Sequence, residues 1–231
     1  ILLNLDTEDD DELTIGCAGG VNVSGEAFYD EIEMNQNFET IRLTVKGLSG
    51  GHSGMDIDKG RGNANKWMAR LLWELKQQTK LQLISMDGGS LRNAIPREAT
   101  CCIAVPKIEE AISLLKNSVE QLKSEYSSIE PEHSFEFVPV ERDGKAVSEE
   151  DGNKILNVLC AVQNGVFRMS PDIPDLVEAS SSLARVIVEK GLFTTQSLQR
   201  SSVESTKAEV SMAIRTCFEN IGATVEQSGD Y

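Results

Sequence analysis

Cysteine and histidine are scarce in this sequence: the 231 residues include five cysteines and two histidines. No two cysteines are spaced C-x-x-C, and the adjacent pair Cys101-Cys102 would point to opposite faces of a strand. A closed structural zinc site is therefore not expected within this chain. The number of cysteines is odd, which favours free buried thiols in a reducing compartment over a disulfide framework.

Basic residues are also in short supply. The chain has 22 Lys+Arg against 37 Asp+Glu, which gives a formal net charge of −15. Phosphate binding needs a basic surface, so we expect no nucleic-acid partner and no anionic membrane partner. No stretch approaches the roughly 20 apolar residues of a spanning helix. The chain begins Ile1-Leu2-Leu3 with no methionine and no recognisable signal peptide, so we expect a piece of a longer protein.

Hydrophobic periodicity predicts a mixture of strands and helices. In the segment F-E-T-I-R-L-T-V-K (38–46), Ile41, Leu43 and Val45 share one face, as in a half-buried strand. Similar patterns predict further strands at 81–86, 99–105, 135–140, 183–188, 194–200 and 223–226. Apolar residues at helical spacing predict helices at 63–78, 108–126, 153–163 and 205–220.

The order of these elements predicts the fold class. Several neighbouring strands are joined too tightly for parallel crossovers, so the fold is expected to be α+β. We expect a two-layer antiparallel sheet with helices on one face, with one such unit over residues 38–126 and a second in the rest of the middle of the chain. Lys190-Gly191 is expected to turn a hairpin, Ser148 to cap a helix, and Gly19-Gly20 to form a turn.

Four local features suggest a functional site. Asp6 ends an apolar run, and His52 lies in the glycine-rich loop G-L-S-G-G-H-S-G. Asn93 lies in the segment L-R-N-A-I-P-R-E. Arg200 lies at the end of a predicted strand, directly before the serines at 201 and 202. An arginine can grip a carboxylate with two parallel hydrogen bonds. Taken singly, each of the four is equally compatible with an ordinary surface residue.

These residues do not assemble a known catalytic centre by themselves. The sequence has no G-x-S-x-G motif and no P-loop, and it shows no nucleophilic triad. One carboxylate and one histidine cannot make a catalytic zinc site, which needs at least three protein ligands. If the chain serves an enzyme, part of the site must come from elsewhere.

Six segments, taken in order, resemble one family. They are L-L-N-L-D-T-E, G-C-A-G-G, K-G-L-S-G-G-H-S-G-M-D-I, G-R-G-N-A-N-K, L-R-N-A-I-P-R-E and G-A-T-V-E-Q-S-G-D-Y. The chain is similar over its whole length to the cytosolic aminoacyl-histidine dipeptidases. These belong to the co-catalytic di-zinc aminoacylase and carboxypeptidase family, whose members combine a catalytic domain with an inserted lid.

The resemblance implies roles for the four residues. Asp6 falls on a zinc ligand, and His52 on a lid histidine that stabilises the oxyanion of the reaction. Asn93 and Arg200 fall on lid residues that hold the substrate, Arg200 being the partner of its terminal carboxylate. The family's other zinc ligands and its general-base glutamate have no counterpart in this chain, so we expect the chain alone to be inactive.

The resemblance also implies a domain division and partners. Residues 1–20 and 205–231 would be remnants of the catalytic domain, and residues 21–204 would be the lid, which closes over substrate and mediates dimerisation. The full-length protein would be a cytoplasmic homodimer that hydrolyses Xaa-His dipeptides with two zinc ions per site, for which manganese or cobalt could substitute. His52 could then act in its own subunit or across the dimer.

Two other functions stay open from the sequence. One is a non-catalytic interaction or dimerisation module with a lid fold. The other is a related aminopeptidase or deacetylase on the same scaffold. The preferred dipeptide and the physiological metal are not fixed by these residues.

Overall fold

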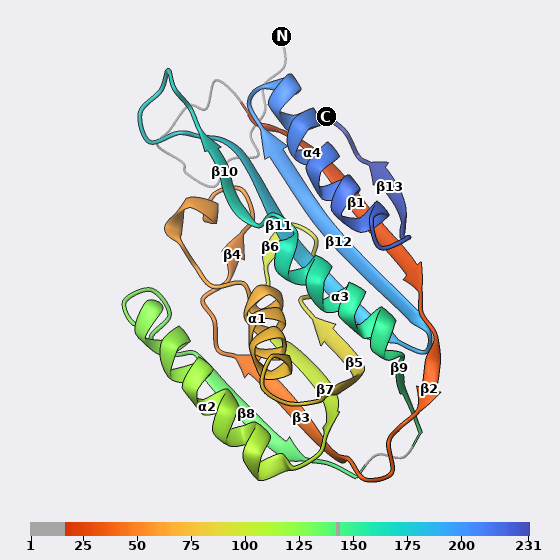
Figure 1. Cartoon of the computed structure of the whole chain (residues 1–231). Coiled ribbons are helices and arrows are strands. Elements are labelled where there is room, and N and C mark those ends of the chain that lie inside the picture. Colours follow the sequence, from red (N-terminus) through yellow and green to blue (C-terminus); the bar gives the residue numbers. More distant parts are fainter. Residues whose placement is uncertain (1–16, 142–143) are drawn as a thin grey trace.

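The computed structural model describes residues 17–141 and 144–231. Asp6 lies outside the described residues. Helices are interspersed among runs of strands along the chain (Figure 1). The strands are β1 (Gly19–Phe28), β2 (Glu31–Glu33), β3 (Glu39–Lys46), β4 (Gly51–His52), β5 (Gln82–Gly88), β6 (Ala94–Ile95), β7 (Ala99–Val105), β8 (Ser134–Pro139), β9 (Lys145–Val147), β10 (Gly165–Met169), β11 (Val177–Glu189), β12 (Leu192–Ser201) and β13 (Thr224–Ser228). The helices are the 3-10 turn η1 (Ile57–Lys59) and the α-helices α1 (Ala64–Lys76), α2 (Ile108–Glu125), α3 (Glu149–Ala161) and α4 (Glu204–Glu219).

One nine-stranded sheet organises the molecule. Its strand order is β13-β1-β12-β11-β5-β7-β3-β8, with β10 added on β11, and the pairings are antiparallel. The expected α+β fold is confirmed. In place of two separate units the described chain has one continuous sheet, whose two halves are joined where Val186, Ile187 and Val188 of β11 pair with β5.

The four α-helices cover one face of the sheet (Figure 1). A single core lies between the two layers, formed in one half by β3, β7 and α1 and in the other by β11, β12 and α4. In the second half, Phe193 of β12 packs against Phe218 of α4, with ring centroids 6.5 Å apart. A smaller cluster on the opposite face, around Ile84 and Cys102, is covered by the β2–β9 ribbon.

Local sequence signals account for several element ends. Ser148 caps α3 as expected, because its hydroxyl accepts a hydrogen bond from the Asp151 N–H. Lys190 and Gly191 both have positive φ (52° and 77°), as in the two-residue turns that suit antiparallel hairpins. The hairpin is longer than expected, mainly because β11 already begins at Val177 and runs through the buried polar residues Ser180, Ser181 and Ser182.

Gly19-Gly20 does not form the expected turn. Both residues begin strand β1, and Gly20 exchanges backbone hydrogen bonds with Tyr231 (3.1 Å each). The Tyr231 ring lies so close that a Cβ at Gly20 would be 2.7 Å from the phenol oxygen. Glycine is present here because another side chain approaches the backbone.

The C-terminal residues pack against the same sheet. Helix α4 lies over β1 and β12, and β13 pairs with β1 from Asn22 to Glu26. The division of the chain after residue 204 stays a prediction. In the described structure, residues 204–228 complete the sheet edge and its helix layer.

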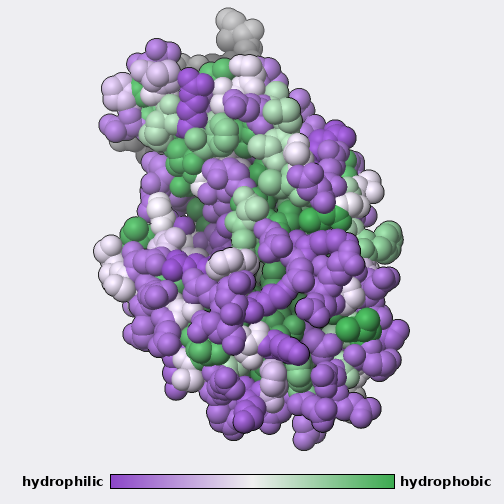
Figure 2. All heavy atoms as spheres, in the orientation of Figure 1, coloured by the Kyte–Doolittle hydropathy of each residue, from purple (hydrophilic) through white to green (hydrophobic). Residues whose placement is uncertain are grey.

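The visible surface of the helix-covered face is largely polar. Figure 2 shows the helix-covered face, on which hydrophilic residues predominate and hydrophobic residues form separate patches. No helix in the described part of the chain is long and apolar enough to span a bilayer.

Candidate functional site

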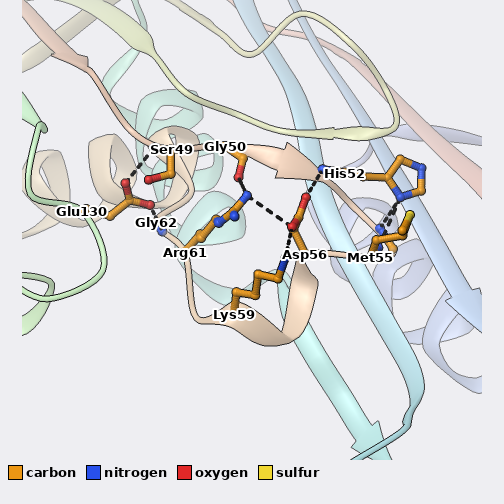
Figure 3. Close-up of polar contacts among 10 residues, drawn as sticks. Ser49, Gly50, His52, Met55, Asp56, Lys59, Arg61, Gly62 and Glu130 are labelled. Atoms are coloured by element: carbon orange, nitrogen blue, oxygen red, sulfur yellow. Dashed lines mark hydrogen bonds and ion pairs between the residues drawn. The ribbon is translucent and has the colours of Figure 1, made fainter. Parts of the chain in front are cut away.

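The loop that carries His52 is closed by a carboxylate within it. The His52 backbone N–H donates to Asp56 Oδ2 (2.7 Å), and the Lys59 ammonium donates to Asp56 Oδ1 (2.6 Å). Arg61 lies 3.4 Å from the same Asp56 oxygen and donates to the Gly50 carbonyl (2.6 Å; Figure 3). The Lys59 and His52 hydrogen bonds hold the pKa of Asp56 below its ordinary value of 3.8. The carboxylate therefore stays ionised and ties the loop together at neutral pH.

The His52 ring is held in one tautomer by the backbone that follows it. Its Nδ1 accepts hydrogen bonds from the N–H groups of Gly54 (3.3 Å) and Met55 (3.2 Å; Figure 3). An acceptor nitrogen carries no proton, so the neutral ring carries its proton on Nε2. His52 therefore presents an N–H donor at Nε2, which is the role the resemblance implies for it.

Arg200 brings a second donor to the same place. It lies near the end of β12, and one terminal nitrogen is 3.4 Å from His52 Nε2. Because both nitrogens carry hydrogen, this approach is a convergence of two donors and not a bond between them. No carboxylate of a described residue lies within ion-pair distance of Arg200. Two converging donors without an acidic partner suit an anionic oxygen that comes from a ligand.

Gly54 permits this close approach. A Cβ at Gly54 would lie 3.1 Å from Arg200 Nε and 3.3 Å from His52 Cε1. Arg200 Nε is buried without a hydrogen-bond partner, which leaves the two terminal nitrogens as the accessible part of the guanidinium. The glycine-rich loop therefore has a local purpose, which is to let the imidazole and the guanidinium meet.

Tyr231 flanks Arg200 on the other side. The other terminal nitrogen of Arg200 lies 3.1 Å from the Tyr231 phenol oxygen. Tyr231 is held by its two backbone hydrogen bonds to Gly20 and by the buried Lys207, whose ammonium donates to its carbonyl (2.9 Å). We did not expect this residue from the sequence, although it closes one of the segments that carry the resemblance. No pattern around it distinguishes it from an ordinary exposed tyrosine.

Asn93 lies beside this group without joining it. Its backbone carbonyl accepts the Ser53 N–H (2.8 Å), and the next residue, Ala94, pairs with His52 in the β4–β6 ribbon. Its side chain is exposed and has no hydrogen-bond partner among the described residues. The structure thus brings His52 and Arg200 together and places Asn93 next to them. The ligand-binding roles of these residues and of Asp6 stay predictions.

A metal ion does not fit the described residues alone. Within residues 17–141 and 144–231, no three His, Cys, Asp or Glu side chains gather in a way that could hold a metal ion. Cys101 is fully buried, and burial raises the pKa of its thiol well above the ordinary value. This disfavours the thiolate that a metal would need. A metal-dependent reaction would therefore need ligands from outside the described part.

Comparison with known proteins gives a family match within the chain. A family model for the peptidase dimerisation domain matches residues 43–130, from β3 through α2. Residues 43–130 are therefore similar to a peptidase dimerisation domain. Both His52 and Asn93 lie within the matched residues of that domain.

Two relatives extend the match beyond the dimerisation domain. The chain is 36% identical to the cytosol non-specific dipeptidase of Escherichia coli (strain K12), over 100% of this chain and 48% of that protein. The crystal structure of the aminoacylhistidine dipeptidase from Vibrio alginolyticus superposes with a TM-score of 0.94 at 36% identity. That match covers 98% of this chain and 46% of the other. The resemblance seen in the sequence is confirmed, and the chain spans about half the length of these relatives.

Proposed function

We propose that this chain is the lid and dimerisation part of a metal-dependent dipeptidase that hydrolyses Xaa-His dipeptides. The observation that supports this most is the convergence of His52 Nε2 and Arg200, 3.4 Å apart, with no carboxylate of a described residue on Arg200. The similarity to two dipeptidases gives the reaction class. The full-length protein would work in the cytosol, as the name of the Escherichia coli relative indicates for that protein.

Arg200 binds the substrate's terminal carboxylate in this proposal. The edge of its guanidinium between Tyr231 and His52 offers parallel N–H groups to two carboxylate oxygens. This contact fixes the position of the substrate before reaction. Asn93, in the exposed turn beside His52, adds a side-chain amide to the same substrate.

His52 donates to the carbonyl oxygen of the scissile peptide bond. In a dipeptide, only the peptide nitrogen and one Cα separate this carbonyl from the terminal carboxylate, so neighbouring donors can serve both groups. The Nε2–H bond strengthens as negative charge develops on that oxygen. A donor of this kind contributes about 3 kcal/mol to transition-state stabilisation.

The metal and the domain division belong to the proposal. Asp6 is one ligand of a pair of zinc ions, for which manganese or cobalt can substitute, and the other ligands come from outside this chain. Such ions would polarise the carbonyl of the scissile peptide bond and activate a water molecule for attack. Residues 1–20 and 205–231 belong with the catalytic domain, and residues 21–204 form the lid.

The protein assembles as a homodimer in which His52 acts across the two-fold axis. The dimerisation domain that contains His52 supports the assembly, and two-fold pairing is the commonest form of oligomer. The alternative arrangement is a lid that closes over the site of its own subunit.

Mixing two inactive full-length variants tests this arrangement. His52→Ala and Asp6→Ala subunits are combined under conditions of confirmed subunit exchange. If His52 acts in trans, about half of the dimers are hybrids with one complete site in two, and roughly a quarter of wild-type activity returns. If no activity returns, the trans arrangement is wrong.

A further inference from the structure

Glu130 is a buried carboxylate that binds both ends of the His52 loop (residues 49–62). Glu130 lies beyond the C-terminal end of α2, and it is 0% exposed. One carboxylate oxygen accepts the Ser49 N–H (2.6 Å), and the other accepts the Gly62 N–H (2.8 Å; Figure 3). No cationic side chain of the described residues forms an ion pair with it.

A buried carboxylate without a cation is costly unless hydrogen bonds satisfy it. Glu130 meets that requirement entirely with the two N–H groups of one loop, which are 68 and 81 residues away in the sequence. Its own backbone is fixed at the end of α2, where the Glu130 N–H donates to the Tyr126 carbonyl (2.8 Å). Tyr126 in turn packs against Trp67 of α1, with ring centroids 4.7 Å apart. The loop is therefore tied through Glu130 to the helix layer.

The inside of the loop is stiffened separately. Asp56 binds the His52 backbone, and Arg61 connects Asp56 to the Gly50 carbonyl. These bonds close the loop into one connected unit. Arg200 belongs to β12 and not to the loop. The position of His52 relative to Arg200 therefore depends on where the base of the loop is held.

We propose, on the basis of the function proposed above, that Glu130 is a positioning residue that sets His52 against Arg200. Its two hydrogen bonds fix the base of the loop, and the Asp56 network transmits that position to the imidazole. Glu130 touches neither substrate nor metal in this role. Its loss acts on turnover through His52 and leaves the carboxylate contact of Arg200 in place.

Glu130→Gln in the full-length protein tests the proposal. Glutamine keeps the size of the side chain, but its NH₂ group cannot accept a hydrogen bond, so one of the two loop N–H groups loses its partner. Since a misplacement of about 1 Å can cost about 100-fold in rate, we expect kcat to fall about 10- to 100-fold with KM little changed. The matched control is Glu125→Gln at the last residue of α2, which removes the Arg70 ion pair but no contact with the loop. The control should keep wild-type kcat.

A double-mutant cycle with His52→Ala decides between positioning and general structural damage. If Glu130 acts through His52, Glu130→Gln lowers kcat in the wild-type background and changes it little in the His52→Ala background. An equal loss in both backgrounds, or no loss in either, overturns the proposal. If His52→Ala alone leaves kcat unchanged, the proposed role of His52 is wrong, and the role of Glu130 falls with it. Should Glu130→Gln fail to fold, the same double-mutant cycle is measured with Glu130→Asp. That variant keeps both carboxylate oxygens on a shorter side chain.

Discussion

Replacing Arg200 by lysine in the full-length protein keeps the positive charge and removes the planar fork. In the structure one terminal nitrogen of Arg200 lies 3.1 Å from the Tyr231 phenol oxygen, and the other lies 3.4 Å from His52 Nε2. The two nitrogens form the outer edge of the guanidinium. In the proposed function, a substrate carboxylate on that edge would receive two parallel hydrogen bonds. A lysine ammonium is a compact charge that cannot offer the same pair.

The expected cost follows from the lost contact. Arg200→Lys forfeits at least one charge-assisted hydrogen bond, which is worth about 1.5–3 kcal/mol. Because about 1.4 kcal/mol corresponds to a factor of ten, kcat/KM should fall roughly 10- to 100-fold. Steady-state kinetics on an Xaa-His dipeptide measures this loss. A dipeptide amide, which lacks the terminal carboxylate, should show a much smaller difference between the two proteins.

Arg185→Lys is the matched control. Arg185 lies on the neighbouring strand β11, where its guanidinium binds Asp87 and the Gly89 carbonyl. It has no contact with His52 or Arg200 among the described residues, so its replacement should leave kcat/KM unchanged. Wild-type kinetics for Arg200→Lys, or an equal loss in the Arg185→Lys control, would refute the reasoning.

Three further predictions concern the chain alone, Tyr231 and Asp56. The chain by itself should hydrolyse no dipeptide with added Zn²⁺, Mn²⁺ or Co²⁺, because its described residues gather no metal-binding group; turnover that Asp6→Ala abolishes would contradict this. In the full-length protein, Tyr231→Phe should raise KM by about 5-fold with kcat retained, since it removes a single hydroxyl beside Arg200; steady-state kinetics that show unchanged KM would exclude Tyr231 from the site. The lowered pKa of Asp56 means that its ionised form stabilises the fold above its ordinary value of 3.8, and this contribution is lost as the pH falls through the lower native value. The difference in thermal midpoint between wild type and Asp56→Asn should therefore be largest near neutral pH and shrink in acid, and a difference independent of pH would count against it.

The sequence predicted the α-helices and most of the longer strands because their signals are local, but it missed β1 and β10. The four α-helices have continuous apolar stripes, and the Lys190-Gly191 turn has the residue types that its positive φ angles require. The two- and three-residue strands β2, β4, β6 and β9 were not predicted, because such short segments show no alternation. The prediction of a turn at Gly19-Gly20 was wrong. These residues are glycines because Tyr231, from the other end of the described chain, packs closely against their backbone.

The site was predictable only in part. The glycine-rich loop pointed to His52, and the end of a predicted strand pointed to Arg200, but no local pattern could show that the two meet. Their meeting depends on contacts far apart in the sequence, because both the β4–β6 ribbon and the Glu130 hydrogen bonds hold the loop that brings His52 to Arg200. Glu130 gave no signal, because its function depends on backbone N–H groups far away in the sequence.

A crystal structure of the full-length protein with a phosphinic dipeptide analogue tests the central claim most directly. The phosphinic oxygens stand in for the oxygen that becomes negatively charged during hydrolysis, and the analogue keeps the terminal carboxylate. The account predicts a hydrogen bond from His52 Nε2 to a phosphinic oxygen and paired N–H contacts from Arg200 to the carboxylate. A bound analogue whose oxygen and carboxylate are held by other residues, with His52 and Arg200 out of contact, would contradict it.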